Sequence, residues 1–149
     1  QHHFLSVTKQ GVTAIVSTKG NDACHLILRG SSKGPNYDAA SIKEVTKQLE
    51  AAGLPKALMV DCSHGNSLKD YRNQPAVAQS LCEQIAAGSQ AITSVMVESN
   101  LVEGAQKLQG SLADLTYGQS VTDECINWET TENMLEEFAK AVQARRLAR

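Results

Sequence analysis

Side chains that can bind anions and metals stand at the ends of three apolar runs in this 149-residue sequence. The run CHLILR ends on Arg29, and the run SVMVE ends on Glu98. The run ALMVD ends on Asp61, and His64 follows three residues later. If the three runs are parallel strands, their ends lie at one rim of a sheet, which is where barrel enzymes build their active sites. A guanidinium, an imidazole and two carboxylates would then converge from distant parts of the chain.

Such a cluster would suit a divalent cation and an anionic substrate. Histidine, glutamate and aspartate together form a ligand set for Mn²⁺, Fe²⁺, Co²⁺ or Zn²⁺. Three protein ligands with an open coordination position are typical of a catalytic metal that acts as a Lewis acid on a carbonyl group. Arg29 would bind a phosphate or a carboxylate through two parallel hydrogen bonds.

Each of these residues also has a purely structural interpretation. Arg29 could form an ion pair at a strand end, and His64 could be a hydrogen-bonded loop histidine. Asp123, in the segment SVTD, could cap a helix or a turn. Glu98 is harder to explain in this way, because a carboxylate directly after VMV needs a charged partner or a metal. The expected convergence, more than any single residue, favours a functional site.

The elements that would position these residues alternate between strands and helices. Buried strands are predicted over 24–29, 57–61 and 91–98, and their lack of polar alternation favours parallel pairing. Shorter β-prone runs cover 4–8 and 12–17, and a long glycine-containing loop is predicted between 99 and 130.

Three helices are predicted from apolar stripes at helical spacing. The first begins at Asp38 or Ser41 and is stopped by Gly53 and Pro55. The second has Pro75 in its first turn and ends near Gly88. The third covers roughly Thr131–Ala148.

Alternating strands and helices with short loops indicate βα units. An open doubly wound sheet and part of a closed barrel both fit this order. No GxGxxG or Walker-type loop follows a strand, which disfavours a nucleotide-binding sheet. A full barrel takes about 250 residues, so the chain is predicted to hold about four βα units, or half a barrel. The predicted fold class is α/β, with a single partial-barrel domain over 1–149.

Composition narrows the classes of partner. The chain is 42% hydrophobic and 20% charged with a net charge of −2, which gives no sign of a nucleic-acid or membrane-surface partner. No apolar run approaches the roughly 20 residues that span a bilayer, and no signal peptide is evident. Of the four cysteines, Cys24 and Cys82 lie in apolar runs and are predicted to be core residues. We therefore expect a reduced, cytoplasmic protein. The start at Gln1, without an initiator methionine, suggests a fragment or a processed chain.

Several segments together resemble a known enzyme family. HHFLSVTKQG, CHLILRG, VDCSHGNSLKD, VMVESNLVEG and YGQSVTDECINWETTE occur in order along nearly the whole chain. They resemble type I 3-deoxy-D-arabino-heptulosonate-7-phosphate (DAHP) synthase. The resemblance implies the C-terminal half of a (β/α)8 TIM barrel. It also implies the first reaction of the shikimate pathway to aromatic amino acids, in which phosphoenolpyruvate condenses with erythrose 4-phosphate to give DAHP and phosphate.

The resemblance also implies residue roles. The metal ligands would be His64, Glu98 and Asp123. Arg29 would contact phosphoenolpyruvate, and Asp61 would act beside His64 in catalysis by positioning water or a ligand. Many members of the family are inhibited by an aromatic amino acid, and the implied effector-binding residues are Phe4, Ser6 and Val16.

The sequence also departs from the family pattern. The family's fourth metal ligand, a cysteine, and its KPRT segment lie in the first half of the barrel, and neither is present here. We do not assign Cys62 as that ligand, because nearness to His64 in the sequence is not by itself evidence of metal binding. We expect little synthase activity from the chain alone, and we expect it to pair with the missing N-terminal half and to form a homo-oligomer. Two alternatives remain open: another metal-dependent barrel aldolase or lyase, and an inactive half-barrel that serves assembly or effector binding.

Overall fold

A three-stranded parallel sheet forms the centre of the molecule in the computed structural model, which describes residues 1–148. The strands are β3 (Leu26–Leu28), β4 (Leu58–Asp61) and β5 (Ile92–Met96), and they lie in the order β3-β4-β5. Both strand pairs are parallel, so all three carboxyl ends meet at one rim. The predicted α/β class and parallel pairing are therefore confirmed.

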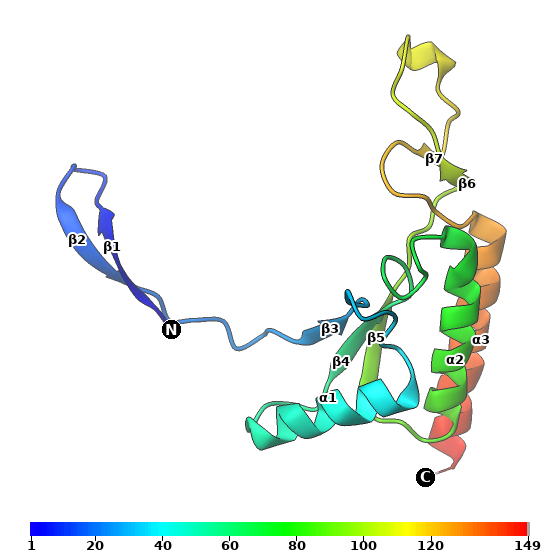
Figure 1. Cartoon of the computed structure of the whole chain (residues 1–149), viewed down its shortest axis with the longest axis horizontal. Helices are drawn as coiled ribbons and strands as arrows, with labels where there is room; N and C mark the ends of the chain where they lie inside the picture. The colour runs from blue at the N-terminus through cyan, green and yellow to red at the C-terminus, as the bar shows by residue number, and fades with distance from the viewer. Residues whose placement is uncertain (149) are drawn as a thin grey trace.

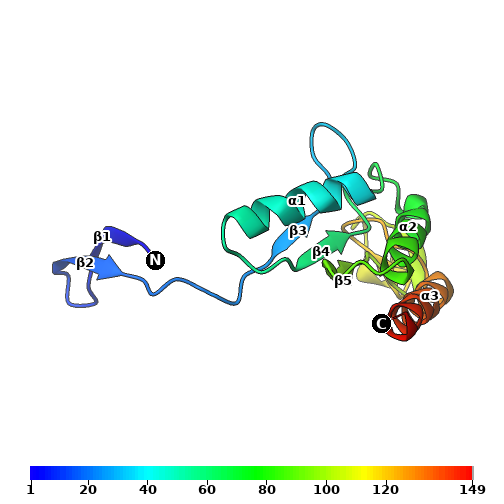
Figure 2. The ribbon, with the colours of Figure 1, turned by 90° about the horizontal axis from the view of Figure 1, so that it is seen from below.

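Three helices connect and flank the strands. Helix α1 (Ala39–Ala51) connects β3 to β4, and α2 (Gln74–Ala86) connects β4 to β5. Helix α3 (Trp128–Leu147) packs along α2, as Figure 1 shows. Seen from below in Figure 2, α1 runs along the strands while α2 and α3 stand together at the β5 side. Two short 3₁₀ helices, η1 (Tyr71–Asn73) and η2 (Leu112–Asp114), lie in the connecting segments.

Capping side chains set the starts of α1 and α3. Asp38 caps α1, and its Oδ1 accepts hydrogen bonds from the backbone N–H groups of Ala40 and Ser41 at 3.0 Å each. This decides between the two predicted starts in favour of Asp38. Helix α3 begins three residues before the predicted Thr131, because Asn127 caps it by accepting from the Thr130 N–H at 2.9 Å.

The core lies on the helix-covered face of the sheet. Leu58 and Val60 of β4 are fully buried and belong to the same cluster as Ile42 of α1 and Leu81 of α2. The opposite face is more open, since Ile27 of β3 is 49% exposed. The prediction that the strands are buried on both faces is thus wrong for β3, because no described element covers its second face.

Two further strand pairs extend from this body. Strands β1 (His3–Val7) and β2 (Thr13–Ser17) form an antiparallel hairpin that stands apart from the sheet in Figure 1. Strands β6 (Val102–Ala105) and β7 (Gln119–Ser120) pair at the base of a projecting arm, where only a loop was predicted. Among residues 1–148 there are three strand–helix units and not about four, because the first two β-prone runs pair with each other.

Two other predictions need correction. Cys82 is buried, but Cys24 is exposed because it lies ahead of β3 at the open edge of the sheet. Strand β5 stops at Met96, so Glu98 lies two residues beyond its strand. Within the described residues, no helix combines the length and the apolar character needed to cross a membrane.

Candidate metal centre

The end of β4 holds an oriented histidine. Asp61 is the last residue of the strand, is only 2% exposed, and places its Oδ2 2.8 Å from His64 Nδ1. Its Oδ1 accepts a hydrogen bond from the Ser63 backbone N–H at 2.8 Å. A carboxylate anion can only accept, so this contact fits a ring that carries a proton on Nδ1 and donates it. In the neutral tautomer of that kind, the second ring nitrogen, Nε2, has a lone pair for another partner.

His64 reaches this position through an unusual backbone conformation. Its φ is +50°, in the left-handed region that non-glycine residues seldom adopt. Leu68 and Lys69 in the same loop also have positive φ values. Local strain of this kind persists only where surrounding contacts hold it, and it is concentrated at functional sites.

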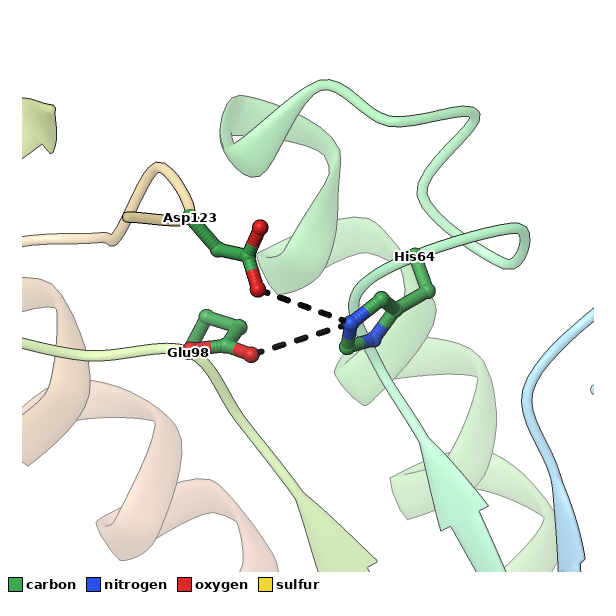
Figure 3. A group of neighbouring side chains, drawn as sticks. All are labelled: His64, Glu98 and Asp123. Carbon is green, nitrogen blue, oxygen red and sulfur yellow. Dashed lines mark ion pairs between the residues drawn. The ribbon is translucent and has the colours of Figure 1, made fainter.

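Two carboxylates face the free nitrogen of His64. Its Nε2 lies 3.8 Å from Glu98 Oε1 and 3.9 Å from Asp123 Oδ2 (Figure 3). One donor atom from each of the three residues lies within 4.8 Å of the others. These separations are too long for hydrogen bonds. The structure therefore brings together the three residues that the sequence analysis named as metal ligands.

The donor set fits a divalent cation. Metal bonds to imidazole and carboxylate are about 2.0–2.2 Å long, so two donors on one ion stand roughly 3–3.5 Å apart. The observed 3.8 and 3.9 Å are slightly wider, and small side-chain rotations would close the difference. Two carboxylates facing a lone pair repel one another unless a cation lies between them. The predicted fourth donor is not supplied by Cys62, which is fully buried and outside this cluster. Burial, and secondarily the nearby Asp61 charge, raises the pKa of the Cys62 thiol to about 12.

Arg29 lies at the same rim. Its Nε is 3.7 Å from Asp61 Oδ2, and its side chain is 59% exposed. Arg29 and His64 line an open cleft of about 820 Å³ that Asp123 borders from the other side. Much of the guanidinium is thus free to bind an anion beside the three donors.

A buried asparagine, which the sequence analysis did not single out, connects the ends of β3 and β4. Asn66 is 2% exposed, and its Nδ2 donates to the carbonyl of Leu28 at 3.1 Å and to that of Asp61 at 2.7 Å. Its Oδ1 accepts from the Asn36 N–H at 2.8 Å, and Asn36 Oδ1 in turn accepts from the Gly30 N–H at 2.8 Å. The backbone segments on either side of Arg29 and at Asp61 are therefore held by one hydrogen-bond network.

Other residues at the site also escaped the sequence analysis. Lys69 and Tyr71, from the loop after β4, line the cleft, and so do Ser31 and Ser32 from the loop after β3. Gln74, at the start of α2, contacts the backbone of Glu98. The only signal for them was proximity in sequence to Arg29 and His64, which does not distinguish cleft residues from ordinary loop residues.

The three effector-binding residues named from the resemblance lie on the hairpin, away from the donor cluster. Phe4 pairs with Val16, and Ser6 follows Phe4 by two residues, so all three side chains are on one face. Phe4 is 50% exposed and Val16 is 38% exposed. The hairpin thus presents a small apolar face with a hydroxyl group beside it.

Fold and site together define an α/β protein whose parallel strands carry a candidate divalent-metal centre at their carboxyl ends. The chain belongs to the DAHP synthetase I family, whose model matches residues 1–136.

Named relatives agree with this assignment. A phospho-2-dehydro-3-deoxyheptonate aldolase of Alternaria alternata is 57% identical over 146 residues, which cover 97% of this chain and 39% of that protein. The Phe-sensitive enzyme of Escherichia coli is 53% identical over 145 residues, covering 97% of this chain and 41% of that protein. A structure of the aldolase from Francisella tularensis has a TM-score of 0.85 at 50% identity and covers 97% of this chain and 41% of that one. The chain therefore spans about 40% of the length of the relatives it matches.

Proposed function

We propose that this chain is part of a metal-dependent DAHP synthase, which condenses phosphoenolpyruvate with erythrose 4-phosphate to give DAHP and phosphate. The observation that carries the proposal is the convergence of His64, Glu98 and Asp123 at the strand-end rim, with Arg29 beside them. Membership of the family supplies the substrates. A different barrel aldolase would need the same donors but other anion contacts.

The residues at the rim would have distinct roles. His64, Glu98 and Asp123 would hold a divalent cation such as Mn²⁺, Fe²⁺, Co²⁺ or Zn²⁺. When bound there, the cation would supply Lewis-acid polarisation of the aldehyde carbonyl. Asp61 keeps the His64 ring in the tautomer that presents Nε2.

Arg29 would bind the anionic groups of phosphoenolpyruvate. Asp61 would orient the Arg29 guanidinium through the ion pair to Nε. Binding two substrates in a fixed relative orientation lowers the entropic part of the barrier to carbon–carbon bond formation. The remaining phosphoenolpyruvate contacts would come from segments outside this chain.

We further propose that β3, β4 and β5 are consecutive strands of a closed (β/α)8 barrel, with the chain as a single partial domain in its C-terminal half. The parallel order with intervening helices supports this, and so does the half-exposed Ile27 on the uncovered face. Strand edges and apolar faces of this kind usually find a partner. The chain alone would then lack the cysteine ligand and the KPRT segment, and would have little activity.

The test uses the complete enzyme. Treatment with a chelator should abolish phosphate release that depends on both substrates, and added Mn²⁺ or Co²⁺ should restore it. His64→Ala should weaken metal binding by more than the roughly 10–100-fold typical of outer-shell partners. His2→Ala, which removes an exposed histidine outside the cluster, is the control. Full activity in metal-free enzyme, or normal metal binding by His64→Ala, would refute the proposal.

A regulatory role is a second candidate, favoured by the face formed by Phe4, Ser6 and Val16. The Escherichia coli relative is named Phe-sensitive, and a Saccharomyces cerevisiae relative is named phenylalanine-inhibited. We propose that this face contributes to an aromatic amino acid site within a homo-oligomer.

Calorimetric titration with phenylalanine, tyrosine and tryptophan identifies the effector, and Phe4→Ala should abolish its binding. Aromatic amino acid binding without any metal binding would instead support an inactive regulatory half-barrel, and sedimentation as a monomer would refute the oligomer.

A further inference from the structure

A fully buried glutamine lies directly behind one of the three donors. Gln74 is the first residue of α2 and is 0% exposed. Its Nε2 donates to the Glu98 carbonyl oxygen at 3.0 Å, and its Oε1 accepts from the Glu98 N–H at 2.9 Å. The side-chain amide thus pairs with both polar groups of a single main-chain residue, as a neighbouring strand would.

Glu98 needs such support because the sheet does not reach it. The β4–β5 ladder ends at the pair Asp61 and Met96, two residues before Glu98. Its backbone N–H is in a part-buried environment, where an unpaired N–H group is costly, and Gln74 Oε1 accepts from it. The Gln74 side chain therefore continues the hydrogen bonding of the chain beyond the end of β5, at the residue whose carboxylate faces His64.

The same contact reaches the segment that carries the third donor. The Glu98 carbonyl also accepts from the Ile126 N–H at 3.0 Å, and Ser99 pairs with Ile126 in an isolated bridge. Ile126 is buried and lies three residues after Asp123. The Glu98 backbone is thus held between α2 on one side and the Asp123 segment on the other.

We propose that Gln74 is a positioning residue of the metal centre, whose carboxamide fixes the main chain of Glu98 and thereby places its carboxylate opposite His64. The inference rests on the proposed function, since it assumes that the three donors bind a cation. The contact uses an N–H donor and a C=O acceptor on the same side chain, and the primary amide of glutamine carries both. Asparagine has the same groups on a stem shorter by one methylene, so it cannot reach both Glu98 atoms from the same backbone position.

The test compares direct metal binding by the complete apoenzyme of three variants, measured by calorimetric titration with Mn²⁺ and Co²⁺, alongside thermal unfolding without metal. Gln74→Met keeps the approximate volume and loses both hydrogen bonds. Gln74→Asn keeps the polarity and carries the test if the methionine variant does not fold. Val77→Ala is the matched control, because Val77 is a core residue of the same helix, 1% exposed, and is not a hydrogen-bonding partner of Glu98.

We expect Gln74→Met to weaken metal binding by about 10–100-fold, as for other outer-shell partners, and Gln74→Asn to weaken it by a smaller factor. Val77→Ala should lower the unfolding temperature but leave the metal dissociation constant within about two-fold of the wild type. Equal losses of affinity in Gln74→Met and Val77→Ala would reduce Gln74 to a structural role and overturn the inference. Wild-type affinity in both Gln74 variants would overturn it as well. If the wild-type enzyme itself binds no metal, the proposed function fails, which is a distinct result.

Discussion

Replacing Gly30 by alanine should separate the ends of β3 and β4. Gly30 has a φ of +81°, and a Cβ built on it would lie 2.5 Å from the Gly65 carbonyl carbon and 2.6 Å from the Gly65 Cα. Those neighbours are backbone atoms, so they cannot move aside as a flexible side chain would. The Gly65 N–H donates to the Arg29 carbonyl at 3.1 Å, and this contact would open.

The expected cost has two parts. The left-handed conformation costs an L-residue about 1–2 kcal/mol. Inserting a methyl group into a packed contact costs about 1–3 kcal/mol more. The sum is about 2–5 kcal/mol for Gly30→Ala. Gly53→Ala isolates the first part, because Gly53 has a φ of +67° and a Cβ there would meet no atom within 4 Å.

The assay is equilibrium urea unfolding of the complete enzyme and both variants, followed by circular dichroism. Gly30→Ala should lose more stability than Gly53→Ala by about 1–3 kcal/mol, the packing part alone. It should also weaken binding of phosphoenolpyruvate, since Arg29 precedes Gly30 directly. Equal destabilisation by the two substitutions would refute the close approach on which this reasoning depends.

Three further outcomes follow from particular contacts. Asp38→Ala should destabilise the protein by about 1 kcal/mol at neutral pH, while Asp38→Asn should keep most of the cap. Hydrogen bonds from the Ser41 side chain and backbone lower the pKa of Asp38. The contribution of the Asp38 carboxylate to stability is therefore complete above about pH 4 and is lost as the carboxyl group protonates at lower pH. Measuring the free energy of unfolding across this acidic range checks the prediction. Burial raises the pKa of Cys82 to about 11 and that of Cys62 to about 12. Iodoacetamide at pH 8 should therefore label both thiols only after denaturation. Rapid labelling of the native protein, detected by peptide mass spectrometry, would contradict this prediction. Leu81 is 0% exposed, and Leu81→Ala should cost about 2–5 kcal/mol in urea unfolding, whereas a loss under 1 kcal/mol would show that the α2 core is loosely packed.

Hydrophobic runs were sufficient to predict the parallel strands and the meeting of their ends. The runs that contain Val60 and Val95 lack polar alternation, and parallel pairing then forces Asp61 and the segment after Met96 to the same rim. That topology brings His64 and Glu98 to the same rim, whereas the orientation of His64 toward Glu98 also depends on its positive φ. The shared rim could be predicted without the loop conformation, because each residue lies within three positions of a strand end.

The parts that were not predicted depend on single side-chain contacts with the backbone. Helix α3 begins three residues before the predicted start because Asn127 caps it. The spacing of apolar residues, from which the helix was predicted, does not indicate a capping hydrogen bond. Asn66 and Gln74 gave no signal either, because the contacts that connect separate elements are to main-chain groups far along the chain: Gln74 contacts Glu98, 24 residues away, and Asn66 contacts Leu28, 38 residues away. The antiparallel pairing of β1 and β2 was missed because two β-prone runs predict strands without predicting their partners.

The three donors of the cluster make no hydrogen bonds to one another. His64 Nε2 is 3.8 and 3.9 Å from the two carboxylates, beyond hydrogen-bond range, and the carboxylates repel each other. Two of the three donor residues are held by hydrogen bonds from outside the cluster. Asp61 hydrogen-bonds the imidazole ring of His64, and Gln74 hydrogen-bonds the backbone of Glu98. Asp123 is 70% exposed and is the donor with the most freedom to move. A cation bound between two carboxylates that outside contacts hold a few ångströms from the imidazole would relieve their repulsion, and this supports the metal centre that we propose for the rim.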